Sequence, residues 1–119
     1  MAPAMARVVT GMYFSIDGRD IIMFASRASA ERFLEAYDVG PGQDTIFRSD
    51  GVAVRLRPSG RRVTVTDDVV AKAPAALAEA LRRFLLEVRP ETRSLAQDRI
   101  RSADLPELVE EFVRTEKAR

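Results

Sequence analysis

The stretch RSDGVAVRLRPSGRRVTVTDD, residues 48–68, decides the fold, because two turn signals divide it into strands of alternating apolar and polar residues. The first turn signal is Asp50-Gly51, and the second is PSGR at residues 58–61. Two-residue turns at these places pair Phe47 with Val54, Thr45 with Leu56, Leu56 with Val63, and Val54 with Val65. The sequence therefore predicts a three-stranded antiparallel meander.

Alternation along these strands separates two faces of the meander. One face carries the apolar side chains Phe47, Val52, Val54, Leu56, Val63 and Val65. The other face carries Ile46, Arg48, Ala53, Arg55, Arg57, Arg62, Thr64 and Thr66. Burial of the first set fixes the register, since a slip of one residue would move the arginines into the core.

The arginines of the second face form the candidate partner-binding site, which consists of Arg48, Arg55, Arg57 and Arg62. Three interpretations stay open. The face is the solvated side of a half-exposed sheet, or the C-terminal helix covers it with Glu107, Glu110 and Glu111, or it docks an acidic protein surface or a phosphate backbone. Only Phe47 is aromatic on these strands, which disfavours RNA, because RNA-binding sheets stack bases on exposed rings.

A hairpin precedes the meander, in GMYFSIDGRDIIMF at residues 11–24. A two-residue turn at Asp17-Gly18 pairs Ile16 with Arg19, Phe14 with Ile21 and Met12 with Met23, and it places Tyr13, Ile22 and Phe24 on the opposite face. Apolar side chains on both faces indicate a central position in the sheet, or a face that later elements cover.

Three segments have helical periodicity. ASAERFLEAY at 28–37, which Ser26 or Ser29 can cap, has the apolar stripe Ala30, Phe33, Leu34 and Tyr37. PAALAEALRRFLLEVRP at 74–90 has the stripe Leu77, Leu81, Phe84, Leu85 and Val88. DLPELVEEFVRTEKAR at 104–119 has capping-box spacing from Asp104 to Glu107 and the stripe Leu105, Leu108, Val109, Phe112 and Val113. The last stripe either completes the core of the chain or supplies a homodimer contact.

The order of these elements, β-β-α-β-β-β-α followed by one or two helices, predicts the α+β class. We expect a five-stranded antiparallel sheet with helices packed on one face and a helical C-terminal extension. The 119 residues are enough for one core, so residues 1–90 and the extension 91–119 are expected to form a single domain. The pair Asp67-Asp68 is expected to form a turn that leads into the helix at 74–90, and GPGQD at 40–44 is expected to form a plain loop.

Composition excludes much chemistry. The chain has neither cysteine nor histidine, so disulfides, thiolates and the commonest proton shuttle and metal ligand are excluded. It also lacks metal-ligand spacings, glycine-rich phosphate loops and nucleophile elbows, and we expect no cofactor and no enzymatic activity. A net charge of +1 disfavours a strongly basic nucleic-acid binder, and short apolar runs without a signal-peptide pattern predict a cytoplasmic protein.

The segment AERFLEAYDVGPGQDTIFRSDGVAVRL, residues 30–56, resembles small actinobacterial immunity-type proteins that are encoded beside polymorphic toxins. The similar features are an A-E-x-x-L-E-A-x-D-V motif beginning at Ala30, a strand, the Asp50-Gly51 turn and another strand. The resemblance implies a non-enzymatic protein that binds and blocks a toxin domain, and it assigns no functional residue. We therefore expect a small protein-binding module; the alternative is a nucleic-acid-binding regulator, dimeric through the C-terminal helices.

Overall fold

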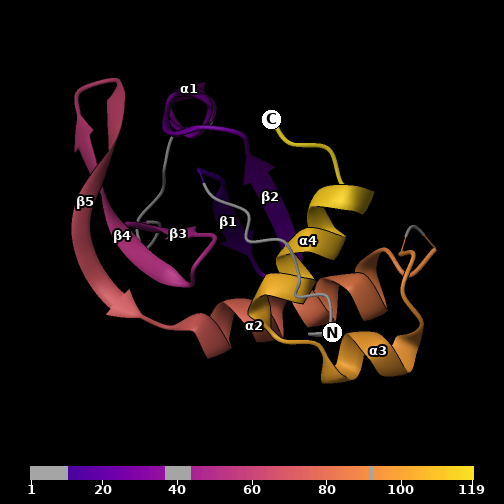
Figure 1. The fold of residues 1–119 in the computed structure, drawn as a ribbon. Coiled ribbons are helices and arrows are strands. Elements are labelled where there is room, and N and C mark those ends of the chain that lie inside the picture. Colours follow the sequence, from indigo (N-terminus) through magenta and orange to yellow (C-terminus); the bar gives the residue numbers. More distant parts are fainter. Residues whose placement is uncertain (1–10, 37–43, 92) are drawn as a thin grey trace.

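The structure, a computed structural model, describes residues 11–36, 44–91 and 93–119 (Figure 1). Its strands are β1 (Tyr13–Asp17), β2 (Asp20–Phe24), β3 (Thr45–Arg48), β4 (Val52–Ser59) and β5 (Arg62–Lys72). Its helices are α1 (Arg27–Ala36), α2 (Pro74–Arg83), the π-helical turn η1 (Phe84–Val88), α3 (Gln97–Ser102) and α4 (Leu105–Thr115). All strand pairs are antiparallel, in the order β2-β1-β3-β4-β5, which confirms the predicted α+β class and five-stranded sheet.

The helices cover both faces of the sheet, although we expected them on one face. Phe14 and Met23 belong to a core cluster with α2 and α4, whereas Tyr13 and Phe24 belong to a second cluster with α1. In Figure 1, α1 and α2 accordingly lie on opposite sides of β1 and β2. The cause lies in the first hairpin, which carries large apolar side chains on both faces and therefore has two surfaces to bury.

Two hairpin turns lie one residue further along the chain than expected, and each begins with a glycine at a φ of +61°. In β1–β2 the loop is Gly18 and Arg19, so Phe14 lies opposite Met23 instead of Ile21. In β4–β5 the loop starts at Gly60, and Leu56 lies opposite Val65 instead of Val63. Each shift changes the partner by two residues, and the faces therefore stay as predicted.

The β3–β4 turn differs more, because its loop comprises three residues, 49–51, instead of two. Gly51 has a φ of +85°, and its N–H donates to the carbonyl of Arg48 at 3.0 Å. This extra residue shifts the register by one, so that Ile46 lies opposite Val54 and Phe47 lies opposite Ala53. Ile46 is therefore buried beside α1, at 2% exposure, and the expected placement of Phe47 and Ile46 was wrong.

Strand β5 is longer than expected, and the predicted turn at Asp67-Asp68 was wrong. Both residues lie inside the strand, which pairs with β4 as far as Lys72 and is offset by bulges near Val54. The two carboxylates point to different sides. Asp67 pairs with Arg27 of α1, whereas Asp68 pairs with Arg57 of β4. The extended strand thus presents its two neighbouring carboxylates to ion-pair partners on opposite sides of the sheet.

The helical stripes are buried largely as predicted. Ser26 accepts a hydrogen bond from the N–H of Ser29 at 3.1 Å and caps α1. The stripes bury Ala30 and Leu34 in α1, and Leu77, Leu81, Phe84 and Leu85 in α2 and η1. Tyr37 and most of the expected loop at 40–44 lie outside the described residues. Asp104 caps α4 by accepting from the N–H of Glu107 at 3.1 Å, as the capping-box spacing predicted.

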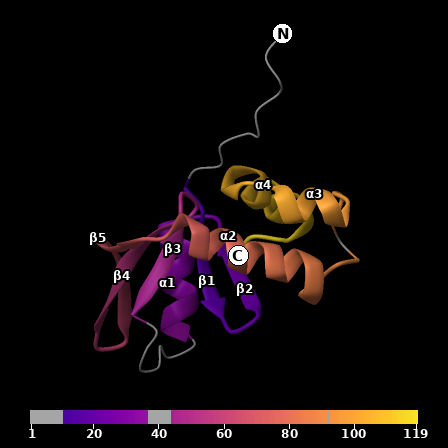
Figure 2. The same cartoon turned by 90° about the horizontal axis from the view of Figure 1, so that it is seen from below.

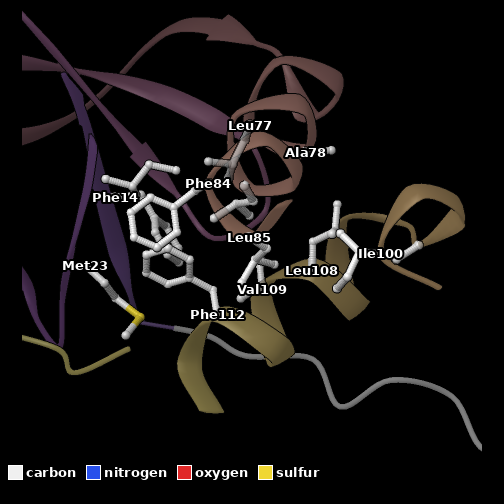
Figure 3. Close-up of a cluster of buried hydrophobic side chains, with 13 residues drawn as sticks. Phe14, Met23, Leu77, Ala78, Phe84, Leu85, Ile100, Leu108, Val109 and Phe112 are labelled. Atoms are coloured by element: carbon white, nitrogen blue, oxygen red, sulfur yellow. The ribbon is translucent and has the colours of Figure 1, made fainter. Parts of the chain in front are cut away.

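Helix α4 completes the core of the single chain. The ring of Phe112 packs against the rings of Phe14 and Phe84, whose centroids are 5.7 Å and 5.0 Å away (Figure 3). Leu108 and Val109 fill the neighbouring space, and Figure 2 shows α3 and α4 beside α2. The C-terminal extension is therefore packed into the same core as the sheet.

Candidate functional site

Three of the four candidate arginines share one surface, which we call the outer arginine face. It consists of Arg55, Arg57, Arg62, Thr64 and Thr66, on the side of β4 and β5 that faces away from α1. Their strand neighbours Leu56 and Val65 are buried against α1, so alternation turns this set the other way. The β4–β5 hairpin also projects away from α2, α3 and α4 (Figure 1), and all three arginines are exposed.

The outer arginine face carries excess positive charge. Arg57 forms an ion pair with Asp68 at 3.2 Å, and its side chain is still 66% exposed. Within the described ranges, no carboxylate pairs with Arg55 or Arg62. Exposed cations on neighbouring strands repel each other weakly in water, so an incoming carboxylate would relieve this repulsion.

The C-terminal helix does not cover the outer arginine face, and the interpretation that placed its acidic residues there was wrong. Glu107 pairs with Arg99 of α3, and Glu110 pairs with Arg114 one helical turn away. Glu111 is buried in α4 and accepts hydrogen bonds from residues 94 and 95. These carboxylates stabilise the helical part of the fold.

Arg48 lies apart from the other three arginines. It is opposite Tyr13 on the side of the sheet that faces α1, because the three-residue turn reverses the faces of β3. Its guanidinium donates to both carboxylate oxygens of Asp50, from Nε at 3.2 Å and from Nη2. The expected set of four arginines on one face is therefore split into three and one.

Arg48 belongs to a pocket of about 610 Å³ at one end of the sheet, which we call the sheet-end pocket. Its polar lining consists of Tyr13, Arg27, Arg48, Ser49, Asp50 and Asp67. Its other lining residues are Gly11, Met12, Pro74, Leu105, Pro106 and Val109. The starts of β1 and α1, the end of β3, the middle of β5 and the first turns of α2 and α4 meet there, so the fold assembles the pocket from distant segments.

Two ion pairs organise the polar lining of the sheet-end pocket. Arg27 donates to the hydroxyl of Tyr13 from Nε and Nη2, both at 3.4 Å, and forms an ion pair with Asp67. These contacts, that with Tyr13 first and that with Asp67 second, raise the pKa of the Arg27 guanidinium. The hydrogen bond to Asp50 likewise raises the pKa of Arg48.

Sequence reasoning missed Tyr13, Arg27 and Asp67 as members of a site. Tyr13 belongs to an apolar strand, Arg27 to the first turn of a helix, and Asp67 to an expected turn. Arg27 is 14 residues from Tyr13 and 40 residues from Asp67 along the chain. No local motif marks residues that only the tertiary fold brings together.

The arrangement in the sheet-end pocket suits binding better than proton transfer. A carboxyl that acts as a general acid at neutral pH needs a raised pKa. The hydrogen bond from Arg48, helped by the N–H of Val52, instead lowers the pKa of Asp50. Among the described residues, no cluster of three or more metal-ligating side chains occurs, and no helix is long and apolar enough to span a bilayer.

Comparison of the chain with protein-family models, with curated proteins and with solved structures gave no match. The functional argument therefore depends on the surfaces of the chain itself.

Proposed function

We propose that this chain is a small, non-enzymatic, cytoplasmic protein-binding module that docks an acidic surface of a partner protein on its outer arginine face. The observation that carries the proposal is that Arg55 and Arg62 are exposed on one surface and have no carboxylate partner in the described part of the chain. Complementary charge steers such a partner and selects against basic surfaces.

The backbone beneath these arginines favours docking. Arg57 and Arg62 stand on a paired β-ribbon whose opposite side is packed against α1, and the Oγ1 of Thr66 donates to the carbonyl of Arg55 at 2.7 Å. A rigid platform loses little backbone entropy on binding. The sequence resemblance to immunity-type proteins supports a partner that is blocked by this contact, such as a toxin domain with an acidic surface.

The test compares two double variants with the same change in net charge. R55E/R62E reverses the outer arginine face, whereas R83E/R101E reverses two exposed arginines on α2 and α3 that also lack a carboxylate partner within the described residues. Tagged wild type and both variants are used to capture partners from an extract of the source organism. The dissociation constant of any captured protein is then measured at low and moderate salt.

We expect R55E/R62E to weaken binding at least about tenfold, with a melting temperature close to that of the wild type, because both side chains are exposed. R83E/R101E should bind like the wild type. Equal binding by both double variants would contradict the proposal, as would a large loss of stability in R55E/R62E with intact binding.

Exposed arginines could equally attract phosphates, and the alternative of a nucleic-acid-binding regulator is tested with the same variants. Electrophoretic mobility shifts with duplex DNA and with single-stranded RNA at low salt would show binding that weakens steeply as salt rises. Phe47, the aromatic residue of β3, is half-buried, which leaves it poorly placed to stack on bases. We therefore expect no retardation, and retardation that R55E/R62E abolishes would overturn the protein-binding proposal.

A further inference from the structure

The sheet-end pocket has two unlike walls. One wall is apolar and comes from Met12, Pro74, Leu105, Pro106 and Val109, of which Met12, Leu105 and Val109 also pack into the core that α4 completes. The other wall is polar and contains the ion pairs of Arg27 and Arg48. Its volume of about 610 Å³ is in the range of pockets that bind small molecules.

We propose that the sheet-end pocket binds a small amphipathic carboxylate, whose apolar body lies against the α4 wall and whose carboxylate accepts hydrogen bonds from Arg27 and Arg48. This site is separate from the outer arginine face. Its occupancy does not depend on the proposed protein partner.

The hydrogen bonding of the polar wall favours an anion over a cation. Asp50 uses both carboxylate oxygens, because Oδ1 accepts from Arg48 and from the N–H of Val52, and Oδ2 accepts from Arg48. In contrast, Arg27 and Arg48 each donate through Nε and Nη2, and Nη1 of each has no acceptor among the described residues. Asp67 keeps Oδ2 as an unused acceptor among the described residues, but the two Nη1 groups offer more unused donors than this. An anionic acceptor therefore satisfies most of the unused hydrogen-bonding capacity of the wall.

The charge of the polar wall favours a singly charged head group. Two guanidinium groups, of Arg27 and Arg48, are balanced by two carboxylates, of Asp67 and Asp50. A phosphate monoester with nearly two negative charges would be repelled by both aspartates more strongly than a carboxylate would. A planar carboxylate also matches the geometry of guanidinium donors.

The apolar wall sets the body of the ligand. Leu105 and Pro106 form the first turn of α4, and Val109 follows one turn later on the same side. Together with Met12 they present aliphatic surface without hydrogen-bonding side chains. An unbranched alkyl chain of medium length gains from burial there.

The test is a titration of the full-length ¹⁵N-labelled protein with octanoate, followed through amide chemical shifts. Octanamide and octylamine are neutral and cationic comparators with chains of the same length. We expect saturable shifts for Tyr13, Ser49 and Val109 with octanoate, and affinities at least about tenfold weaker for both comparators, because they lack the charge-assisted hydrogen bonds.

Three variants locate the site. R48M removes one guanidinium and should weaken octanoate binding at least about tenfold, and L105W, which fills the apolar side, should abolish it. R83M, at the C-terminal end of α2 and outside the pocket lining, should bind as the wild type does. The absence of saturable shifts, equal binding of octylamine, or undiminished binding by folded L105W would each overturn the proposal; if R48M fails to fold, L105W decides.

Discussion

Glu111 accepts two hydrogen bonds from Ser94, one from the backbone N–H at 2.7 Å and one from the side-chain hydroxyl at 2.6 Å. Glu111 is almost fully buried, at 1% exposure, so its carboxylate depends on such donors. The N–H of Leu95 donates to the same carboxylate at 2.7 Å, and Arg114 approaches it at 3.3 Å. The carboxylate thus fastens the segment before α3 onto α4, in a region where main-chain N–H groups have no helical partner.

The first prediction is that E111Q destabilises the fold by about 1.5–3 kcal/mol, the range for hydrogen bonds to a charged group. Ser94 and Leu95 donate three hydrogen bonds to the two carboxylate oxygens of Glu111. In E111Q an NH₂ group replaces one of these oxygens, so a donor would face a donor. Chemical denaturation at neutral pH measures the loss. E110Q is the matched control, since Glu110 is a more exposed neighbour in the same helix, and it should cost less than about 1 kcal/mol. Equal losses for the two variants would contradict this role for Glu111.

The second prediction concerns pH. Burial acts to raise the pKa of Glu111, but hydrogen bonds from the Ser94 hydroxyl and from the N–H groups of Leu95 and Ser94 outweigh it, so the pKa lies below the usual 4.5. A lowered folded-state pKa means that the stabilisation is fully present above the usual pKa and is lost as pH falls through the folded-state pKa. The difference in unfolding free energy between wild type and E111Q should therefore shrink between pH 7 and about pH 3. A difference that stays constant would contradict this explanation.

The third prediction is that G51A is much more harmful than G60A. A Cβ at Gly51 would lie 2.3 Å from the Cα of Pro74, whereas a Cβ at Gly60 would meet nothing within 4 Å. Both positions have positive φ, which costs an alanine about 1–2 kcal/mol. At Gly51 the overlap with backbone adds about 1–3 kcal/mol, since the start of α2 must move. Denaturation curves of the two variants compare them directly, and similar losses would refute the close approach of the β3–β4 turn to the start of α2.

These glycines also show what the sequence could establish about the fold. Periodicity predicted the type and order of the five strands and of the three longer helical segments, because these elements repeat their apolar residues over several positions, whereas it left the number of C-terminal helices at one or two. The turn chemistry was less certain. The loops that start at Gly18 and Gly60 lie one residue later than predicted, and every side chain kept its predicted face. The loop before Val52 has three residues instead of two, so the residues of β3 lie on the opposite faces from those predicted. Arg48 is therefore separated from the outer arginine face.

The candidate site was predictable to the same extent. Arg55, Arg57 and Arg62 lie within one hairpin, so local alternation was enough to place them together. The sheet-end pocket depends on contacts such as that between Arg27 and Asp67, which are 40 residues apart. Only the docking of α1 and α4 on opposite sides of the sheet determines which distant side chains meet.

The fourth prediction is that the carboxylates of α1 protect the edge of the sheet. The outward N–H groups of Val65 and Val63 donate to Glu31 at 2.8 Å and to Glu35 at 3.1 Å. E31A/E35A should lose about 1–3 kcal/mol and should self-associate, because unpaired N–H groups on an edge strand recruit other strands. Size-exclusion chromatography with light scattering measures the association. E31Q/E35Q, which keeps an acceptor oxygen at both positions, should stay monodisperse, and association of both double variants alike would contradict the edge argument.

The last prediction separates the two roles that sequence analysis left open for the C-terminal stripe. If α4 completes the core of one chain, as the contacts of Phe112 with Phe14 and Phe84 indicate, F112A should destabilise the protein by about 3–5 kcal/mol. V113A, at a partly buried position on the next residue, should cost less. The thermal midpoint of the wild type should not change with protein concentration. A homodimer held together by this stripe would instead unfold at a midpoint that rises with concentration, because mass action stabilises an assembled state, and F112A would then abolish that dependence.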